Sequence, residues 1–140
     1  MTSSHIELLN PEGTPTPAAH YSQVAVSTLG GCRLAFLSGQ VGTFADGTVS
    51  EDADVEARTM WSNVKAALAG ADFPLSAIVK ITLYIVAGSD IGPPSRIREE
   101  LLGAHKPAST LVYVAGLARP GWRYEADVIA TMPSLSVQTT

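Results

Sequence analysis

The apolar residues of this chain recur with two different periods, which predict helices and strands. From Ser50 to Ala71 they recur at steps of three and four residues, so one apolar stripe predicts a helix. Ser50 is the expected N-cap, and the acidic residues after it suit the positive end of the helix dipole. A second, shorter helix is predicted from Ser95, its expected cap after two prolines, to near Gly103.

Alternating apolar positions predict the strands, most clearly over residues 78–86. One face of this strand is predicted to carry Val79, Ile81, Leu83 and Ile85, and the other Lys80, Thr82, Tyr84 and Val86. The second face is only partly polar. We therefore expect both faces to be covered, one by a helix and the other by a neighbouring subunit.

The remaining elements complete a β-β-α-β-α-β-β order. Gly30-Gly31 lies between two apolar runs and predicts a hairpin, and Asp46-Gly47 predicts a second turn. The final two strands flank a turn at 118–122. We interpret residues 1–140 as one domain, with an extended N-terminal segment over 1–18 and a loose polar tail over 133–140.

Composition limits the classes of function. The chain has 9 basic and 13 acidic residues, a net charge of −4, and no basic cluster that would meet nucleic-acid phosphates. No apolar run is long enough to span a membrane, and no signal peptide is recognised at the N-terminus. The single cysteine, Cys32, cannot form an internal disulfide, which fits a cytoplasmic location.

Candidate chemistry is sparse. The three histidines are scattered and the cysteine has no partner at ligand spacing, so no metal site is expected. Alternation on the last strand places Arg123, Glu125 and Asp127 on one face. Carboxylates in an apolar strand indicate a cleft, a structural ion pair with Arg123 or Lys80, or a solvated face, and these readings stay open.

Polar residues and a glycine at the ends of predicted strands are the other candidates for lining a binding or catalytic site. Ser109 and Thr110 follow a proline at a strand entrance, where they line a site or simply begin the strand. A serine nucleophile would need a base within reach, and only His105 is near in sequence. Tyr21 precedes the first predicted strand and offers either core packing or a rim hydroxyl. Gly39 follows the second and allows close approach to backbone N–H groups, or forms a bulge.

Six short motifs together resemble the Rid family, also called YjgF or endoribonuclease L-PSP. These motifs are YSQ at 21–23, LSGQV at 37–41, IVKITLYI at 78–85, GAHKPAST at 103–110, VYVAGL at 112–117 and YEADVIA at 124–130. The resemblance implies an α+β, chorismate-mutase-like domain with a mixed sheet covered on one face by two helices. It also implies a homotrimer with ligand clefts between subunits and hydrolysis of reactive imines or enamines without metal or cofactor.

Carried over residue by residue, the resemblance names a candidate site. The family's tyrosine falls on Tyr21, its glycine on Gly39 and its last-strand carboxylate on Asp127, which would position water or move a proton. The remaining substrate-binding positions fall on Ser95, Ser109, Thr110 and Leu111.

Ser109 occupies the position at which the deaminases of the family carry arginine. That arginine would bind an α-carboxylate through two charge-assisted hydrogen bonds, and serine cannot replace it. We therefore expect a less positive pocket, poor hydrolysis of 2-imino acids, and a small metabolite without the usual carboxylate as ligand. Arg96, Arg119 or Arg123 is the alternative source of the missing cation.

Two alternatives to imine hydrolysis stay open. A non-catalytic trimer could bind a small metabolite or a regulatory partner through the same clefts. Ribonuclease activity, the family's older label, is disfavoured by the acidic balance and the absent basic patch.

Overall fold

The computed structural model describes residues 4–134, which form one mixed seven-stranded sheet with two α-helices. Six strands lie side by side in the order β1-β2-β3-β7-β5-β6, and β4 pairs with β7. The strands are β1 (Ser4–Leu9), β2 (Val24–Leu29), β3 (Cys32–Leu37), β4 (Gln40–Val41), β5 (Ile78–Val86), β6 (Ala108–Val114) and β7 (Tyr124–Pro133). Only the β5–β6 pair is parallel, so the predicted mixed α+β sheet is confirmed.

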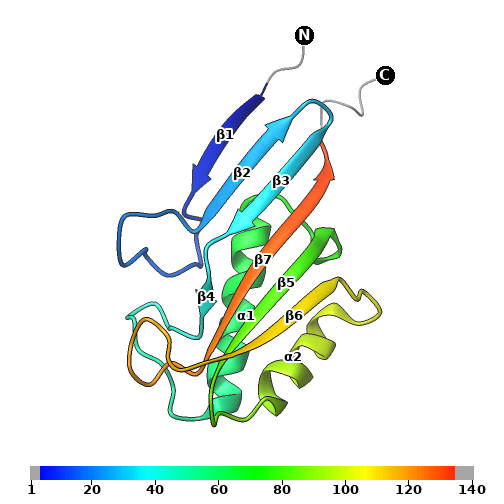
Figure 1. Ribbon diagram of the computed structural model, residues 1–140. Helices are drawn as coiled ribbons and strands as arrows, with labels where there is room; N and C mark the ends of the chain where they lie inside the picture. Colours follow the sequence, from blue (N-terminus) through cyan, green and yellow to red (C-terminus); the bar gives the residue numbers. More distant parts are fainter. Residues whose placement is uncertain (1–3, 135–140) are drawn as a thin grey trace.

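The helices α1 (Ala53–Gly70) and α2 (Gly92–Leu102) lie on the same face of the sheet, behind it in Figure 1. A short 3₁₀ helix, η1 (Leu75–Ala77), leads into β5. The core lies between this face and α1. Its fully buried large side chains include Met60, Trp61, Leu68, Ile81, Leu83, Ile85 and Tyr124. No helix in the described range is both long and apolar enough to cross a bilayer.

Both helix caps differ from the sequence predictions. The carboxylate of Asp52, and not Ser50, caps α1, because Oδ1 accepts hydrogen bonds from the N–H groups of Asp54 and Val55. Ser50 lies two residues before Asp52, and its hydroxyl accepts a hydrogen bond from the N–H of Asp52. Ser95 lies inside α2 because the prolines at 93 and 94 occupy the first turn, which tolerates their missing N–H groups.

The predicted assignment of β5 side chains to two faces is correct from Ile81 onward. It is wrong at Val79. The register with β7 shifts between Ile78 and Lys80, so an irregularity of the bulge type lies at Val79. Ile78 is therefore buried, and Val79 is 41% exposed, whereas the prediction grouped Val79 with Ile81, Leu83 and Ile85. From Ile81 onward the predicted alternation holds.

The ends of the described chain are more ordered than predicted. Within the predicted N-terminal extended segment, residues 4–9 form β1, which pairs with β2 along its whole length. At the other end, β7 runs through Pro133, and the N–H of Ser134 donates to the carbonyl of Gly31. Residues 135–140 of the predicted tail lie outside the described residues.

The predicted turns are confirmed. A two-residue turn joins β2 to β3, with Gly30 at φ 60°. Gly47 has φ 85° in the second turn, where the carboxylate of Asp46 accepts hydrogen bonds from the N–H and hydroxyl of Thr48.

Within residues 4–134, no helix or strand covers the sheet face opposite the helices (Figure 1). Apolar side chains on this face remain solvent-accessible, including Ile6, which is 70% exposed, and Phe36, which is 44% exposed. The edge strand β6 has no buried residue. Thr82 and Tyr84 on β5 are only half-buried on the same open face.

Candidate functional site

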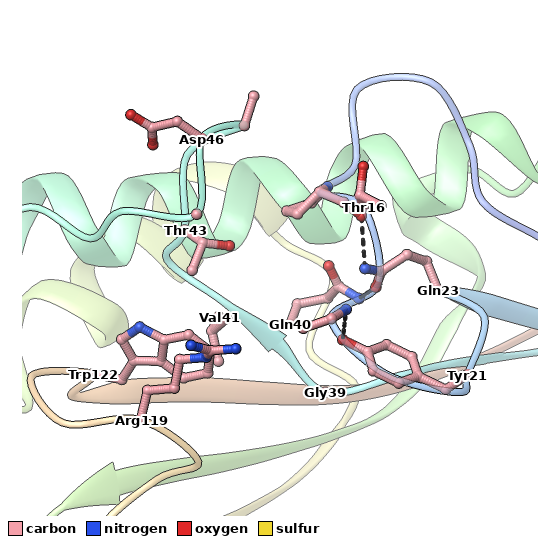
Figure 2. Close-up of a pocket in the computed structure, with 14 residues that line it drawn as sticks. Thr16, Tyr21, Gln23, Gly39, Gln40, Val41, Thr43, Asp46, Arg119 and Trp122 are labelled. Atoms are coloured by element: carbon pink, nitrogen blue, oxygen red, sulfur yellow. Dashed lines mark hydrogen bonds between the residues drawn. The ribbon is translucent and has the colours of Figure 1, made fainter.

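A pocket of about 380 Å³ lies where the loop before β2, β4 and the loop between β6 and β7 meet. Tyr21 and Gly39, both predicted from the sequence, line it together with Arg119 and Trp122. Figure 2 shows Arg119 and Trp122 on one side of this pocket and Tyr21 on the other. Tyr21 is 46% exposed, so it is a rim residue and not part of the core. Its hydroxyl accepts a hydrogen bond from the N–H of Ala18 at 3.4 Å.

Two buried glutamines hold this pocket together. The Gln40 side-chain N–H donates to Oε1 of Gln23 at 2.7 Å and to the carbonyl of Ser38 at 2.9 Å. Gln23 in turn donates to the carbonyl of Pro15 at 2.9 Å. Buried amides that are hydrogen-bonded hold the backbone segments around them in place. The Gln23–Gln40 hydrogen bond therefore fixes the YSQ motif against the LSGQV motif, which sets the position of Tyr21 relative to Gly39.

Gly39 also lines a neighbouring pocket that contains two carboxylates. A Cβ added at Gly39 would lie 2.0 Å from Oε2 of Glu125, so the carboxylate of Glu125 packs directly against the Gly39 backbone. Glu125 and Asp127 lie on β7, and both line this pocket with Tyr84. The predicted alternation is confirmed from Tyr124 onward, because Tyr124, Ala126 and Val128 are buried on the opposite face. It is wrong at Arg123, which lies before β7 and whose side chain pairs with the buried Glu56 of α1.

The environment favours the protonated form of Glu125. Burial raises the pKa of this carboxyl, and the negative charge of Asp127 raises it further. Arg123, two residues before Glu125, does not offset these effects by pairing with it, because its guanidinium pairs with Glu56. A carboxyl group whose pKa is raised in this way can act as a general acid.

Asp127 belongs to a row of polar residues across the open face. Thr82 pairs in register with Asp127 on β7 and with Thr110 on β6. Thr110 accepts a hydrogen bond from the Lys80 ammonium at 2.6 Å. The structure therefore places Thr110 on the same face as Asp127, two strands away, or about 10 Å at ordinary strand spacing.

The other predicted residues lie elsewhere on the chain. Ser109 and Leu111 pair with Ile81 and Leu83, so they face the helix side of the sheet. Ser109 lines a pocket between α2 and β6 that contains neither Tyr21 nor Gly39. Ser95 is half-buried in the first turn of α2 and lines none of these three pockets.

The alternative arginines have different surroundings. Arg96 pairs with Asp54, and Arg123 lies 3.1 Å from Oε1 of Glu56, a fully buried carboxylate, so neither is free. Arg119 lines the Tyr21 pocket. Arg98, which the sequence analysis did not consider, donates from Nη1 to the Ser109 hydroxyl at 2.9 Å.

Sequence reasoning named Glu125 without separating its role from that of Asp127, and it missed Arg98. Glu125 was placed on the face of Asp127, but only packing against Gly39 distinguishes the two carboxylates. Arg98 is eleven residues from Ser109, and no local pattern signals their contact. Among the described residues, histidine, cysteine and acidic side chains form no group of three that would hold a metal.

The comparisons with known proteins agree with this fold and these motifs. The family model described as Endoribonuclease L-PSP matches residues 12–132. The chain belongs to this family, as the motifs predicted.

Related proteins span nearly the whole chain. A RutC family protein of Pyrococcus horikoshii is 26% identical over 119 residues, covering 81% of this chain and 88% of the relative. The solved Rid-family protein YyfA of Yersinia pestis is 25% identical with a TM-score of 0.80, covering 91% of this chain and all of that one. Escherichia coli TdcF, solved with bound serine, is 25% identical with a TM-score of 0.79, covering 90% and 98%.

Proposed function

We propose that this protein hydrolyses a small reactive imine or enamine by adding water at the imine carbon. The observation that carries the proposal is the Glu125 carboxylate beside the Gly39 backbone, two residues from Asp127 and next to the Tyr21 pocket. Family membership supports it, since the resemblance implies this chemistry. Water attack and proton transfer are all that the reaction requires.

The two carboxyl groups suit complementary roles. Asp127 accepts a proton from the attacking water, the role expected for it from the sequence. Glu125, which burial and Asp127 keep more protonated than an ordinary glutamate, donates a proton to the nitrogen. The C=N bond becomes a carbinolamine, which collapses to a carbonyl compound and ammonia. The N–H groups near Gly39 and the hydroxyl of Tyr21 orient the substrate.

The site is proposed to form between subunits of a homotrimer. Tyr21, Gly39 and the carboxylates lie in adjoining pockets, whereas Ser109 lies beside α2 in a separate one. A second copy of the chain packed on the open face would bring the two groups together, and the exposed apolar residues on that face support this arrangement. Ser109 cannot bind a carboxylate in a bidentate manner, so a 2-imino acid would need its cation from another residue.

Ammonia release from imines generated in situ by an amino-acid oxidase tests the proposal. We expect the protein to accelerate release above the spontaneous rate, and Glu125→Gln and Asp127→Asn each to abolish most of the acceleration. Glu7→Gln, an exposed glutamate on β1, is the matched control. If both site variants kept wild-type rates, the assigned roles would be wrong.

A second candidate is binding without turnover. The Tyr21 pocket combines aromatic rings, a guanidinium and a carboxylate, from Tyr21, Trp122, Arg119 and Asp46, which suits a small zwitterion. A solved relative, TdcF, carries bound serine. Saturable binding of serine with no consumption of any imine would favour this candidate, and consumption of a bound imine would exclude it.

A further inference from the structure

Tyr84 lies beside the two carboxylates of β7, on the neighbouring strand. It is in register with Glu125, and Thr82, two residues before it on β5, is in register with Asp127. Side chains opposite each other in an antiparallel pair lie on the same face of the sheet. Tyr84, Glu125 and Asp127 therefore share the open face, and all three line one pocket of about 550 Å³.

This pocket has two different walls, with the carboxylates between them. β7 pairs with β4 on one side and with β5 on the other. Gly39, directly before β4, supplies backbone to the first wall, where the Glu125 carboxylate packs. Tyr84 belongs to the second wall, with Val114 of β6 and residues 116–118. A ligand bound above the carboxylates therefore contacts the Gly39 backbone on one side and the Tyr84 phenol on the other.

The hydroxyl of Tyr84 is available to such a ligand. Tyr84 is half-buried, and within the described part of the chain its hydroxyl has no hydrogen-bond partner. Two other tyrosine hydroxyls are engaged, since that of Tyr124 donates to the carbonyl of Asp90 and that of Tyr21 accepts a backbone N–H. A phenol that is taken out of water normally finds a partner for its O–H. The O–H donor of Tyr84 is thus left for a group that enters the pocket.

We propose that Tyr84 is a further catalytic residue, whose hydroxyl donates a hydrogen bond to the oxygen that water adds to the substrate. This inference rests on the proposed function and names another group in the same site. Tyr84 keeps its own proton throughout the reaction. Its hydrogen bond stabilises the negative charge that develops on this oxygen, as a donor aimed at a reacting oxygen does in other hydrolytic sites.

The charge develops when the carbinolamine collapses. In the addition step, a C–O bond forms, one water proton passes to Asp127 and Glu125 protonates the nitrogen. In the collapse, the carbinolamine O–H proton passes to Glu125, a C=O bond forms, and the C–N electron pair leaves with the nitrogen. The nitrogen takes the proton held by Asp127 and departs as ammonia, which returns both carboxyl groups to their starting states.

Tyr84→Phe tests the proposal in the ammonia-release assay, because it removes the hydroxyl and keeps the ring. The competing explanation is that Tyr84 provides only apolar surface, to the pocket or to a second copy of the chain. We expect kcat to fall at least about tenfold with KM nearly unchanged. Tyr113→Phe is the matched control, since Tyr113 is 57% exposed and pairs with Ile85, so it lies on the helix side of β6. A wild-type kcat in Tyr84→Phe, or an equal loss in Tyr113→Phe, would overturn the proposal.

Binding of hydrated trifluoroacetone tests the same contact without turnover. In water this uncharged ketone is mainly a gem-diol, whose tetrahedral carbon and hydroxyl groups resemble the carbinolamine. By fluorine NMR, we expect Tyr84→Phe to bind it about three- to tenfold more weakly than wild type, the worth of one hydrogen bond, and Tyr113→Phe to bind it as wild type does. Equal binding by wild type and Tyr84→Phe, or none by wild type, would contradict the proposal.

Further measurements separate this inference from its alternatives. Thermal unfolding and sedimentation compare the fold and assembly of each variant, and a loss of activity that follows a change in assembly would favour the surface role. Weaker gem-diol binding in Tyr84→Phe, with no ammonia release from any imine by wild type, would support the ligand contact and exclude hydrolysis. Hydrolysis that needs Glu125 and Asp127 but not the Tyr84 hydroxyl would support the proposed function and exclude the role of Tyr84.

Discussion

The carboxylate of Glu125 packs against the backbone of Gly39, so closely that a Cβ at Gly39 would lie 2.0 Å from Oε2. The atoms in conflict belong to the end of a flexible side chain. We therefore expect Gly39→Ala to displace the Glu125 carboxylate at a cost below about 1 kcal/mol in stability, the usual range for a substitution that side chains accommodate. Hydrolysis is expected to fall at least about tenfold, since general acid catalysis depends on placement.

Paired assays of unfolding and ammonia release check this prediction. Gly116→Ala, which has open space around the added methyl group, is the control for the unfolding measurement alone, because Gly116 lines the same pocket as Glu125. A Gly39→Ala protein with full activity would show that the position of Glu125 does not matter.

The raised pKa of Glu125 predicts a dependence of stability on pH. The folded protein holds this proton more tightly than the unfolded chain, so the free energy of unfolding decreases as pH rises from the ordinary glutamate pKa through the higher folded-state value. Glu125→Gln removes this loss, and we expect the variant to be more stable than wild type at pH 8 while being inactive.

Urea unfolding from pH 4 to pH 8 measures the effect. The pKa of Glu56 is also raised by burial, so part of the pH dependence should persist in Glu125→Gln. Asp127→Asn should weaken the dependence because it removes one of the two causes of the shift. Identical pH profiles for wild type and Glu125→Gln would contradict the prediction.

The buried Glu56 is expected to hold the loop before β7 in place and so to contribute to stability. Its Oε2 accepts the N–H groups of Arg123 and Tyr124 at 2.7 and 3.3 Å, and Oε1 faces the Arg123 guanidinium. Arg123→Met should cost about 2 to 4 kcal/mol of stability because it leaves a buried carboxylate without its cation. Chemical denaturation checks this, and adding Glu56→Gln to the variant should recover part of the loss. A cost below about 0.5 kcal/mol, typical of a surface pair, would refute it.

Mixing two inactive variants tests whether the site lies between subunits. Glu125→Gln damages one group of residues, and Ser109→Phe, which fills the pocket between α2 and β6, damages the other. If neighbouring copies of the chain share a cleft, hybrid trimers regain activity, up to about a quarter of wild type with random assembly. The mixture is refolded together, its mass is measured by sedimentation, and ammonia release is assayed. No recovery in a mixture that has formed hybrids would place the whole site within one chain.

The position of the α1 cap gives a stability prediction. Asp52→Ala should cost about 1 kcal/mol because two N–H groups lose their acceptor. Ser50→Ala should cost only a few tenths of that, since its hydroxyl accepts one N–H outside the helix. Thermal unfolding of both variants compares them, and a larger loss from Ser50→Ala would reverse the assignment.

Local chemistry made much of the fold predictable. The three- and four-residue steps of α1, the alternation on β7 and the positive φ required at Gly30 all depend on neighbours in sequence. The motifs with Tyr21 and Gly39 were likewise sufficient to predict the family and one part of the site.

The sequence alone could not predict the contacts between elements that are distant in the chain. The register of β5 against β7, which exposes Val79, depends on pairing between strands about 50 residues apart. Asp52 and Ser50 are equally good caps by residue type, and the entry path of the chain selects between them.

The sequence by itself determined the period, order and family of the elements, because these follow from side-chain spacing and turn chemistry. Only the tertiary structure decided which carboxylate lies against Gly39 and which arginine lies beside Ser109. Both are contacts between separate elements, and their geometry follows from how α2, β6 and β7 pack and not from any local pattern.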